Sequence, residues 1–328
     1  MNLLVEGWSA ASLICLAAGV LLGAAAGVLS FGRRGERRAE AFRAVGLSAL
    51  LALPLCVYGA HALYCLADAP NLYRLAENPA LLLDLTYGGF ALYGGMAGFV
   101  LACAAAAKLT GRRFLSVLDA LAPAGLIVIA FVRFAEGAAG QGFSLDVENP
   151  ALCFFPLSMY DPEWDVWYLA LFMLEGAYAL GAAAALLGRR EAAQGRQASL
   201  ALLLYAGMQI WFESLRRDNF MRCFGGFVRT MQLISAVIVT GLLLLALARS
   251  ARRPVQKALA LLLHALCLGG VVVLEFAVEY KIAFLASFSM DVLTQPQHYA
   301  MCYGGMLLFV LLMTANVLRA RSADGSKA

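Results

Sequence analysis

Long apolar segments alternate with short polar connections along the whole chain. Nine segments approach or exceed the 20 or so apolar residues that a helix needs to cross a bilayer. They cover residues 8–30, 42–67, 86–107, 117–134, 166–188, 199–216, 229–248, 256–280 and 298–318. They are rich in Ala, Leu and Gly and lack the ten-residue alternation of membrane β-strands. The pattern predicts an all-α polytopic membrane protein with about nine spans.

Composition supports a membrane protein. Hydrophobic residues make up 62% of the 328 positions and charged residues only 14%, which excludes an ordinary soluble domain. The net charge of +4 is explained by the placement of basic residues in loops, so no nucleic-acid partner is expected. The eight cysteines and three histidines do not have the spacing of a disulfide framework or a metal site. We therefore expect no metal and no cofactor.

Basic residues cluster in alternate connections. Eighteen of the 25 Lys and Arg residues fall within 33–43, 108–113, 189–196, 249–257 and 319–327. By the positive-inside rule these connections are cytoplasmic, so nine spans place the N-terminus outside and the C-terminus inside. The first segment has no basic residue before it and "GRRGERR" after it, which predicts an uncleaved helix rather than a secretory signal. Cysteines placed at Gly35 and Gly195 should therefore label only from the cytoplasm.

Among the seven remaining basic residues, Arg133 and Arg216 lie at the far ends of the predicted spans 117–134 and 199–216. We start the fourth helix near Val117, after a capping-box pattern of Ser116 and Asp119, and the sixth near Ser199. Both arginines then lie about 24 Å along their helices. A charge at membrane depth costs free energy unless it has a partner, and at this depth a phospholipid phosphate is a candidate.

Other polar residues are predicted at the same level of the membrane. The spacing of Tyr205, Gln209 and Glu213 places them on one face of the sixth helix. Tyr93 is expected about seven residues inside the third helix, and Gln232 at the outer end of the seventh. The alternative is that Arg133 pairs with Glu136, one turn along, and that each arginine extends its side chain to water.

Several short motifs, in order along residues 8–250, resemble the prolipoprotein diacylglyceryl transferase family of the bacterial inner membrane. They are "YGAHALYCL" (58–66), "GGFALYGGMAG" (88–98), "KLTGRRFLSVLDALAP" (108–123), "VRFAEGAAGQ" (132–141), "IWFESLRRD" (210–218) and "TMQLIS" (230–235). The resemblance implies a seven-helix transferase-like core in residues 1–250. Residues 251–328 then form a C-terminal extension of two transmembrane helices with a short cytoplasmic tail.

The resemblance also implies a reaction and its partners. The family transfers the diacylglyceryl group of phosphatidylglycerol to the lipobox cysteine of prolipoproteins, so the expected partners are phosphatidylglycerol, prolipoprotein signal peptides and membrane lipid. The expected location is the bacterial inner membrane. The candidate catalytic residues are Arg133, Glu213 and Tyr93. The candidate lipid-binding residues are Arg133, Arg216, Tyr205, Gln209, Glu136, Gln232, Gly94 and Gly95.

Some positions depart from the family pattern. Tyr93 stands where the family has histidine, Glu136 where it has asparagine, Gln141 where it has glutamate and Gln209 where it has arginine. Arg133 and Arg216 would supply a cationic clamp for the leaving phosphate, and Glu213 or Tyr93 would take the thiol proton. The alternative function is a non-catalytic lipid-binding or transport protein on the same fold.

Besides Glu136, the outer segment 135–165 carries five carboxylates, those of Asp146, Glu148, Asp161, Glu163 and Asp165. We expect a partly ordered periplasmic cover, with Trp164, Trp167 and Tyr168 at the lipid–water interface. A simple connector between helices is the alternative.

Overall fold

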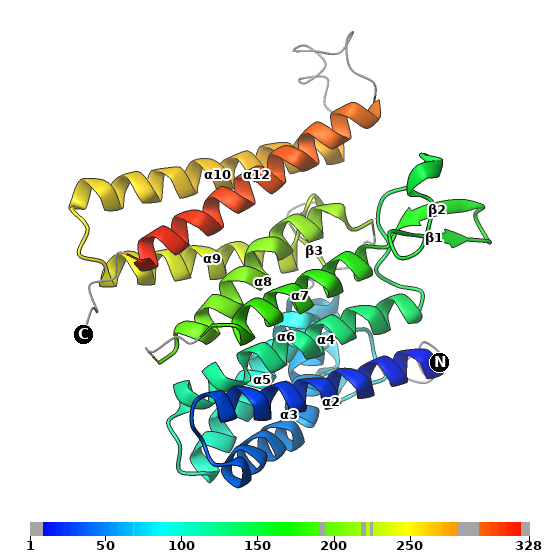
Figure 1. The fold of residues 1–328 in the computed structure, drawn as a ribbon. Coiled ribbons are helices and arrows are strands. Elements are labelled where there is room, and N and C mark those ends of the chain that lie inside the picture. The colour runs from blue at the N-terminus through cyan, green and yellow to red at the C-terminus, as the bar shows by residue number, and fades with distance from the viewer. Residues whose placement is uncertain are drawn as a thin grey trace. The chain divides into compact units, whose positions relative to one another are not determined.

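A computed structural model describes residues 9–67, 69–189, 194–217, 221–223, 226–280 and 295–322. Within them, eight helices are long and apolar enough to cross a membrane, by length and composition. The apolar helix α7 is shorter, with 17 residues. The protein is an all-α polytopic membrane protein, as the sequence predicts (Figure 1).

The chain divides into two compact units, and each is described by itself. The first comprises Met1–Ala201 and Arg216–Asn219, and the second comprises Leu202–Leu215 and Phe220–Ala328. This division follows contacts between residues. The boundary after residue 250 was inferred from the family resemblance and stays a prediction.

The first unit contains most of the short elements that join the apolar helices. Its elements are α2 (Ala10–Arg33), α3 (Arg38–Ala67), α4 (Ala69–Glu77), the 3-10 helix η1 (Pro79–Leu82), α5 (Leu92–Leu109), α6 (Phe114–Ala138), the 3-10 helix η2 (Pro150–Leu152), β1 (Ser158–Asp161), β2 (Val166–Leu169) and α7 (Leu171–Leu187). Strands β1 and β2 form an antiparallel hairpin in which Ser158 pairs with Leu169.

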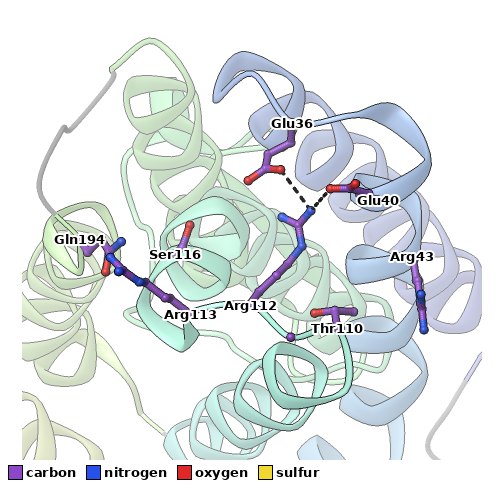
Figure 2. A pocket seen from close by; sticks show the side chains of 9 residues that line it. Glu36, Glu40, Arg43, Thr110, Arg112, Arg113, Ser116 and Gln194 are labelled. Carbon is purple, nitrogen blue, oxygen red and sulfur yellow. Dashed lines mark hydrogen bonds and ion pairs between the residues drawn. The ribbon is translucent and has the colours of Figure 1, made fainter.

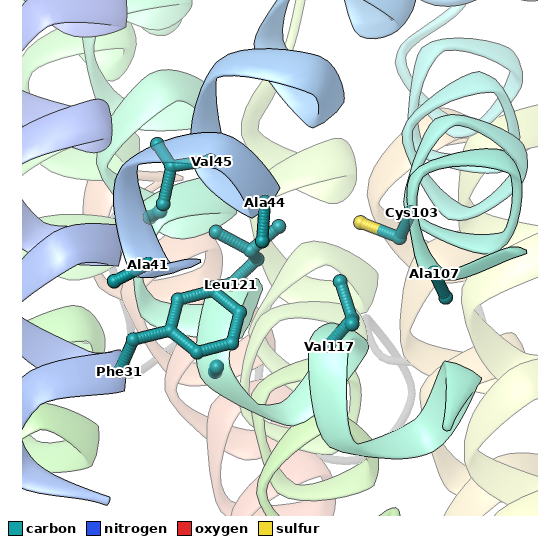
Figure 3. Close-up of a cluster of buried hydrophobic side chains, with 10 residues drawn as sticks. Phe31, Ala41, Ala44, Val45, Cys103, Ala107, Val117 and Leu121 are labelled. Carbon is teal, nitrogen blue, oxygen red and sulfur yellow. The ribbon is translucent and has the colours of Figure 1, made fainter. Parts of the chain in front are cut away.

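A cluster of small and apolar side chains holds four of these helices together. Figure 3 shows Phe31 of α2, Val45 of α3, Cys103 of α5 and Leu121 of α6 within it. Most of the other members are alanines, which allow helix backbones to approach closely where water cannot drive association. Cys103 therefore serves as a small buried apolar residue.

The second unit contains the C-terminal helices. Its elements are α8 (Arg196–Leu215) from Leu202 onward, β3 (Arg222–Cys223), β4 (Val228–Arg229), α9 (Thr230–Arg249), α10 (Pro254–Tyr280) and α12 (Gln295–Ser322). Strands β3 and β4 pair antiparallel just before α9 begins. The two helices predicted beyond the family's usual spans are thus present as α10 and α12.

Two predicted helix starts were wrong by several residues. The segment 166–188 begins as strand β2, and the helix starts only at Leu171. Helix α5 starts at Leu92 rather than 86, because Gly88 has a positive φ of 75° and interrupts the segment before it. Tyr93 therefore lies in the first turn of α5, not seven residues inside it.

The predicted capping box at Ser116 and Asp119 was also wrong. Helix α6 starts at Phe114, and its N-cap Arg113 makes no side-chain cap. The carboxylate of Asp119 instead accepts hydrogen bonds from the backbone N–H groups of Gly195 (2.7 Å) and Ala198 (2.8 Å). A buried carboxylate of one helix thus caps the first turn of another, α8, and satisfies donors that have no partner within that helix.

Contacts within the first unit join three of the connections predicted to be cytoplasmic. Arg112 forms ion pairs with Glu36 (3.1 Å) and Glu40 (2.9 Å), and Arg34 donates to Gln197 (2.5 Å). Figure 2 shows the polar pocket of about 470 Å³ beside Arg112, which is also lined by Arg43 and other residues of these connections. These connections therefore lie at one end of the unit, as alternating basic loops require.

Candidate functional site

Arg133 lies near the C-terminal end of α6 and is buried. From Phe114, at 1.5 Å per residue, it lies roughly 28 Å along the helix rather than the predicted 24 Å. Only 4% of its side chain is exposed. A guanidinium in this position must be paired, since isolated buried charge is costly.

Two carboxylates pair with Arg133. Nη1 of Arg133 donates to both oxygens of Glu136, at 2.9 and 2.8 Å. Nε lies 2.8 Å from Oε2 of Glu175, on α7. The side chain of Glu136 is 27% exposed, whereas that of Glu175 is 1% exposed. Arg133 therefore has one partner that water reaches and one that is fully enclosed.

Sequence reasoning missed Glu175. A signal was available, because "MLEGAY" places one carboxylate in the middle of an apolar segment. An ionisable residue within a membrane span is a site candidate by default. That rule selected Arg133 but was not applied to residues 166–188.

Arg216 follows the last residue of α8 and approaches the same carboxylates. Its guanidinium nitrogens lie 3.8 Å from Oε2 of Glu175 and 3.9 Å from Oε2 of Glu136. Both distances are beyond hydrogen-bond length, so these ion pairs are loose. Two guanidiniums and two carboxylates thus gather at one place in the first unit. Their formal charges sum to zero.

Close packing of α6 against α7 brings Arg133 and Glu175 together. A Cβ atom at Gly176, next to Glu175, would overlap the ring of Phe134, next to Arg133. Gly137 faces the ring of Phe172 in the same way. Small residues at these positions let the two helices approach closely enough for the side chains to pair.

A second group of predicted residues lies in the second unit. Nε2 of Gln209 donates to Oε1 of Glu213 at 2.7 Å, across one turn of α8 as their spacing predicts. Tyr205 is fully buried on the same helix. Gln232, in the first turn of α9, donates to Ser214 of α8 at 3.0 Å.

Tyr93, Gly94 and Gly95 lie at the start of α5 in the first unit. Tyr93 and Gly94 are buried. A Cβ atom at Gly94 would overlap the backbone carbonyl of Gly59 on α3, whereas Gly95 has only ordinary contacts around it. Gly94 therefore has a packing role between α3 and α5, as the Gly94-x-x-x-Gly98 pattern predicts.

Backbone hydrogen bonds join the residues before the β1–β2 hairpin to strand β2, within the predicted outer segment 135–165. Besides the β1–β2 hairpin, the backbone N–H of Leu169 donates to the carbonyl of Leu145 (2.8 Å), and that of Val147 donates to the carbonyl of Trp167 (2.7 Å). Asp146 pairs with Arg217 at 3.2 Å. At the hairpin tip, the Tyr160 hydroxyl donates to Asp165 at 2.5 Å, and this bond raises the pKa of Tyr160.

Gln141 lies exposed just after α6.

Known proteins resemble this chain over most of its length. A family model described as prolipoprotein diacylglyceryl transferase matches residues 13–248. A phosphatidylglycerol–prolipoprotein diacylglyceryl transferase of Shouchella clausii is 27% identical over 232 residues, which cover 67% of this chain and 80% of that protein.

Two further relatives carry the same name. The protein of Finegoldia magna is 26% identical over 202 residues, covering 59% of this chain and 74% of its own length. That of Leptothrix cholodnii is 34% identical over 117 residues, covering 34% and 41%. Since the family model matches more than half of the chain, the protein belongs to the prolipoprotein diacylglyceryl transferase family.

Proposed function

We propose that the protein transfers the diacylglyceryl group of phosphatidylglycerol to the lipobox cysteine of prolipoproteins. The relatives named above are called after this reaction. The proposal rests on one observation. Two arginines, Arg133 near the end of α6 and Arg216 just after α8, lie close to the carboxylate of Glu175 on α7. Arg133 stands at the position of the family's signature arginine.

The arginines act as the clamp on the lipid phosphate. As the C–O bond of the glyceryl group breaks, negative charge grows on the leaving phosphate, and fixed cations stabilise it. A guanidinium can bind two phosphate oxygens at once. The half-exposed Glu136 is the partner that phosphate displaces from Arg133, while the enclosed Glu175 stays and holds the guanidinium in place.

The thiol of the lipobox cysteine supplies the nucleophile. It loses its proton to a base, and the thiolate sulfur forms a bond to the glyceryl carbon. The electron pair of the broken C–O bond leaves with the phosphate of glycerol phosphate. Glu213 and Tyr93 remain the candidate bases from the family resemblance.

The substrates of this reaction indicate where the protein works. Phosphatidylglycerol is a membrane lipid, and the prolipoprotein presents its cysteine at the end of an apolar signal peptide. We infer that this multi-pass protein works in the bacterial inner membrane with signal peptides as protein partners and without nucleic acid.

A second function is favoured by one observation. Two positions of the family's signature hold Glu136 and Gln141, and Gln209 stands where the family has an arginine. In the first unit the carboxylate of Glu136 pairs with Arg133 directly, so a lipid phosphate must compete with it. The second candidate is therefore a lipid-binding protein without turnover.

One experiment separates the two functions. Purified protein is incubated with phosphatidylglycerol labelled in its acyl chains and with a lipobox peptide, and a peptide with serine in place of the cysteine is the control. Labelled cysteine peptide and unlabelled serine peptide support the transferase. Phosphatidylglycerol binding without any labelled peptide supports the second function.

A further inference from the structure

Glu275 is a buried carboxylate in α10, within the C-terminal extension. It lies outside residues 13–248, which match the family model. Neither composition nor the family resemblance assigns it a role. Since a carboxylate within a membrane helix is costly without partners, its contacts indicate what it does.

The partners of Glu275 belong to helices inside the family-matched region. Oε2 accepts a hydrogen bond of 3.4 Å from Nε2 of Gln232, on α9. The Ser214 hydroxyl, on α8, also interacts with this carboxylate, and Arg229 acts on it as the nearby positive charge. All four residues lie in the second unit.

These contacts fix the orientation of the Gln232 amide. Its Nε2 also faces the Ser214 hydroxyl (3.0 Å) and the backbone carbonyl of Ile210 (3.3 Å). A carboxylate accepts hydrogen bonds and a carbonyl cannot donate one, so the NH₂ end of the amide must face this side. The carbonyl end, Oε1, therefore faces the other way.

Oε1 of Gln232 is buried and has no hydrogen-bond partner among the described residues. Buried acceptors are nearly always satisfied. The group that would satisfy this one is a donor. A lipid phosphate has no donor when ionised, whereas the glycerol headgroup of phosphatidylglycerol offers two hydroxyls.

We propose that Glu275 is a positioning residue, which holds the Gln232 amide so that its carbonyl accepts a hydrogen bond from a headgroup hydroxyl of phosphatidylglycerol. The inference rests on the proposed function in one respect, that Gln232 contacts the lipid. The C-terminal extension then contributes to headgroup recognition.

The C-terminal helices are fastened to α8 and α9 by further polar contacts. Thr240 of α9 lies 2.9 Å from the His264 ring of α10, and the Trp211 indole donates to the backbone of Tyr303 on α12 at 2.9 Å. Within the extension, Asn316 donates to Ala260 at 2.8 Å. These bonds keep α10 in a fixed register, which a positioning residue requires.

The test compares two lipids that differ in headgroup hydroxyls. Protein in phosphatidylcholine nanodiscs binds a fluorescent phosphatidylglycerol, and unlabelled phosphatidylglycerol or phosphatidic acid competes. Glu275→Gln removes the charged acceptor that, with the Ile210 carbonyl, holds the NH₂ end of the Gln232 amide in place. We expect phosphatidylglycerol to bind about 2- to 12-fold more weakly, the effect of one hydrogen bond, and phosphatidic acid to bind unchanged.

Two further variants make the assignment specific. Glu279→Gln removes a carboxylate one turn along α10 that pairs with Arg222 at 2.6 Å, and it should leave the preference unchanged. Gln232→Ala should lower the preference as Glu275→Gln does. The double variant Glu275→Gln/Gln232→Ala should lose no more of the preference for phosphatidylglycerol than either single variant, because the two residues act as a unit.

The possible outcomes are distinct. An unchanged lipid preference in Glu275→Gln, or an equal loss for both lipids, overturns the inference. If the wild-type protein transfers lipid and Glu275→Gln keeps its full preference for phosphatidylglycerol over phosphatidic acid, only the inference about Glu275 fails. If the preference for phosphatidylglycerol depends on Glu275 but the wild-type protein never labels the lipobox peptide, only the transferase proposal fails.

Discussion

Arg133 contacts two carboxylates that differ in exposure, and this difference separates their roles. Glu136 is three residues away on the same helix and reaches water, so it can be replaced by a ligand. Glu175 is enclosed and lies between two arginines. The simple ion pair that the sequence left as an alternative is present, and a second carboxylate, which would keep Arg133 paired if a ligand displaced the first, is present as well.

The first prediction concerns the shape of the guanidinium. Arg133→Lys keeps the charge but cannot offer a fork to phosphate while it also pairs with Glu175. We expect a folded protein that loses about 30- to 1,000-fold in transfer rate, equivalent to about 2–4 kcal/mol. Labelled-lipid transfer and phosphatidylglycerol binding measure this. A folded variant with full binding and full turnover would remove the clamp and leave Arg133 as a structural residue.

The two glutamates should respond differently to removal. Glu136→Ala leaves Arg133 paired with Glu175, so the protein should stay folded and still bind lipid. Glu175→Ala leaves two buried guanidiniums with fewer partners and should destabilise the protein by about 3–5 kcal/mol. Unfolding of both variants in the same detergent provides the comparison. Equal stabilities would show that Glu175 has no special structural role.

At the scale of elements, the sequence predicts the helices well and their ends poorly. Long apolar runs correspond to nine apolar helices in the part of the chain that the structure describes. Their starts depend on local features that periodicity does not contain: strand pairing at Val166–Leu169, a left-handed Gly88, and a carboxylate at Asp119 that caps a distant helix. The pairing of Arg133 with Glu175 also escaped prediction, because it depends on which helices are neighbours.

The β1–β2 hairpin should lie at the lipid–water interface. Trp164 at its tip is 69% exposed, and Phe154 and Phe155 nearby are also exposed. Such aromatic residues partition into the headgroup region. Lipids brominated near the headgroup should quench the fluorescence of wild-type protein more than that of Trp164→Phe. Equal quenching would place the tip in water, and unchanged activity after deletion of the tip would make the hairpin a connector.

At the scale of the whole molecule, the orientation in the membrane is the main prediction. Gly35 and Gly195 both have φ of +81°, so a cysteine at either position would strain the backbone. Exposed neighbours, Ala39 and Gln194, are better sites. In intact cells Ala39→Cys and Gln194→Cys should resist an impermeant thiol reagent, while Glu163→Cys in the outer hairpin should react. Labelling of either cytoplasmic site from outside would reverse the topology.

The position of Arg133 and Glu136 on one turn of α6 also bears on synthesis. A ribosome delivers both residues together, long before Glu175 has been made, so the pair can form as soon as α6 closes its last turn. The nascent helix then presents a neutral ion pair instead of a lone arginine to the insertion machinery. Glu136 is therefore expected to ease the entry of α6 into the bilayer, since a lone arginine at membrane depth is costly.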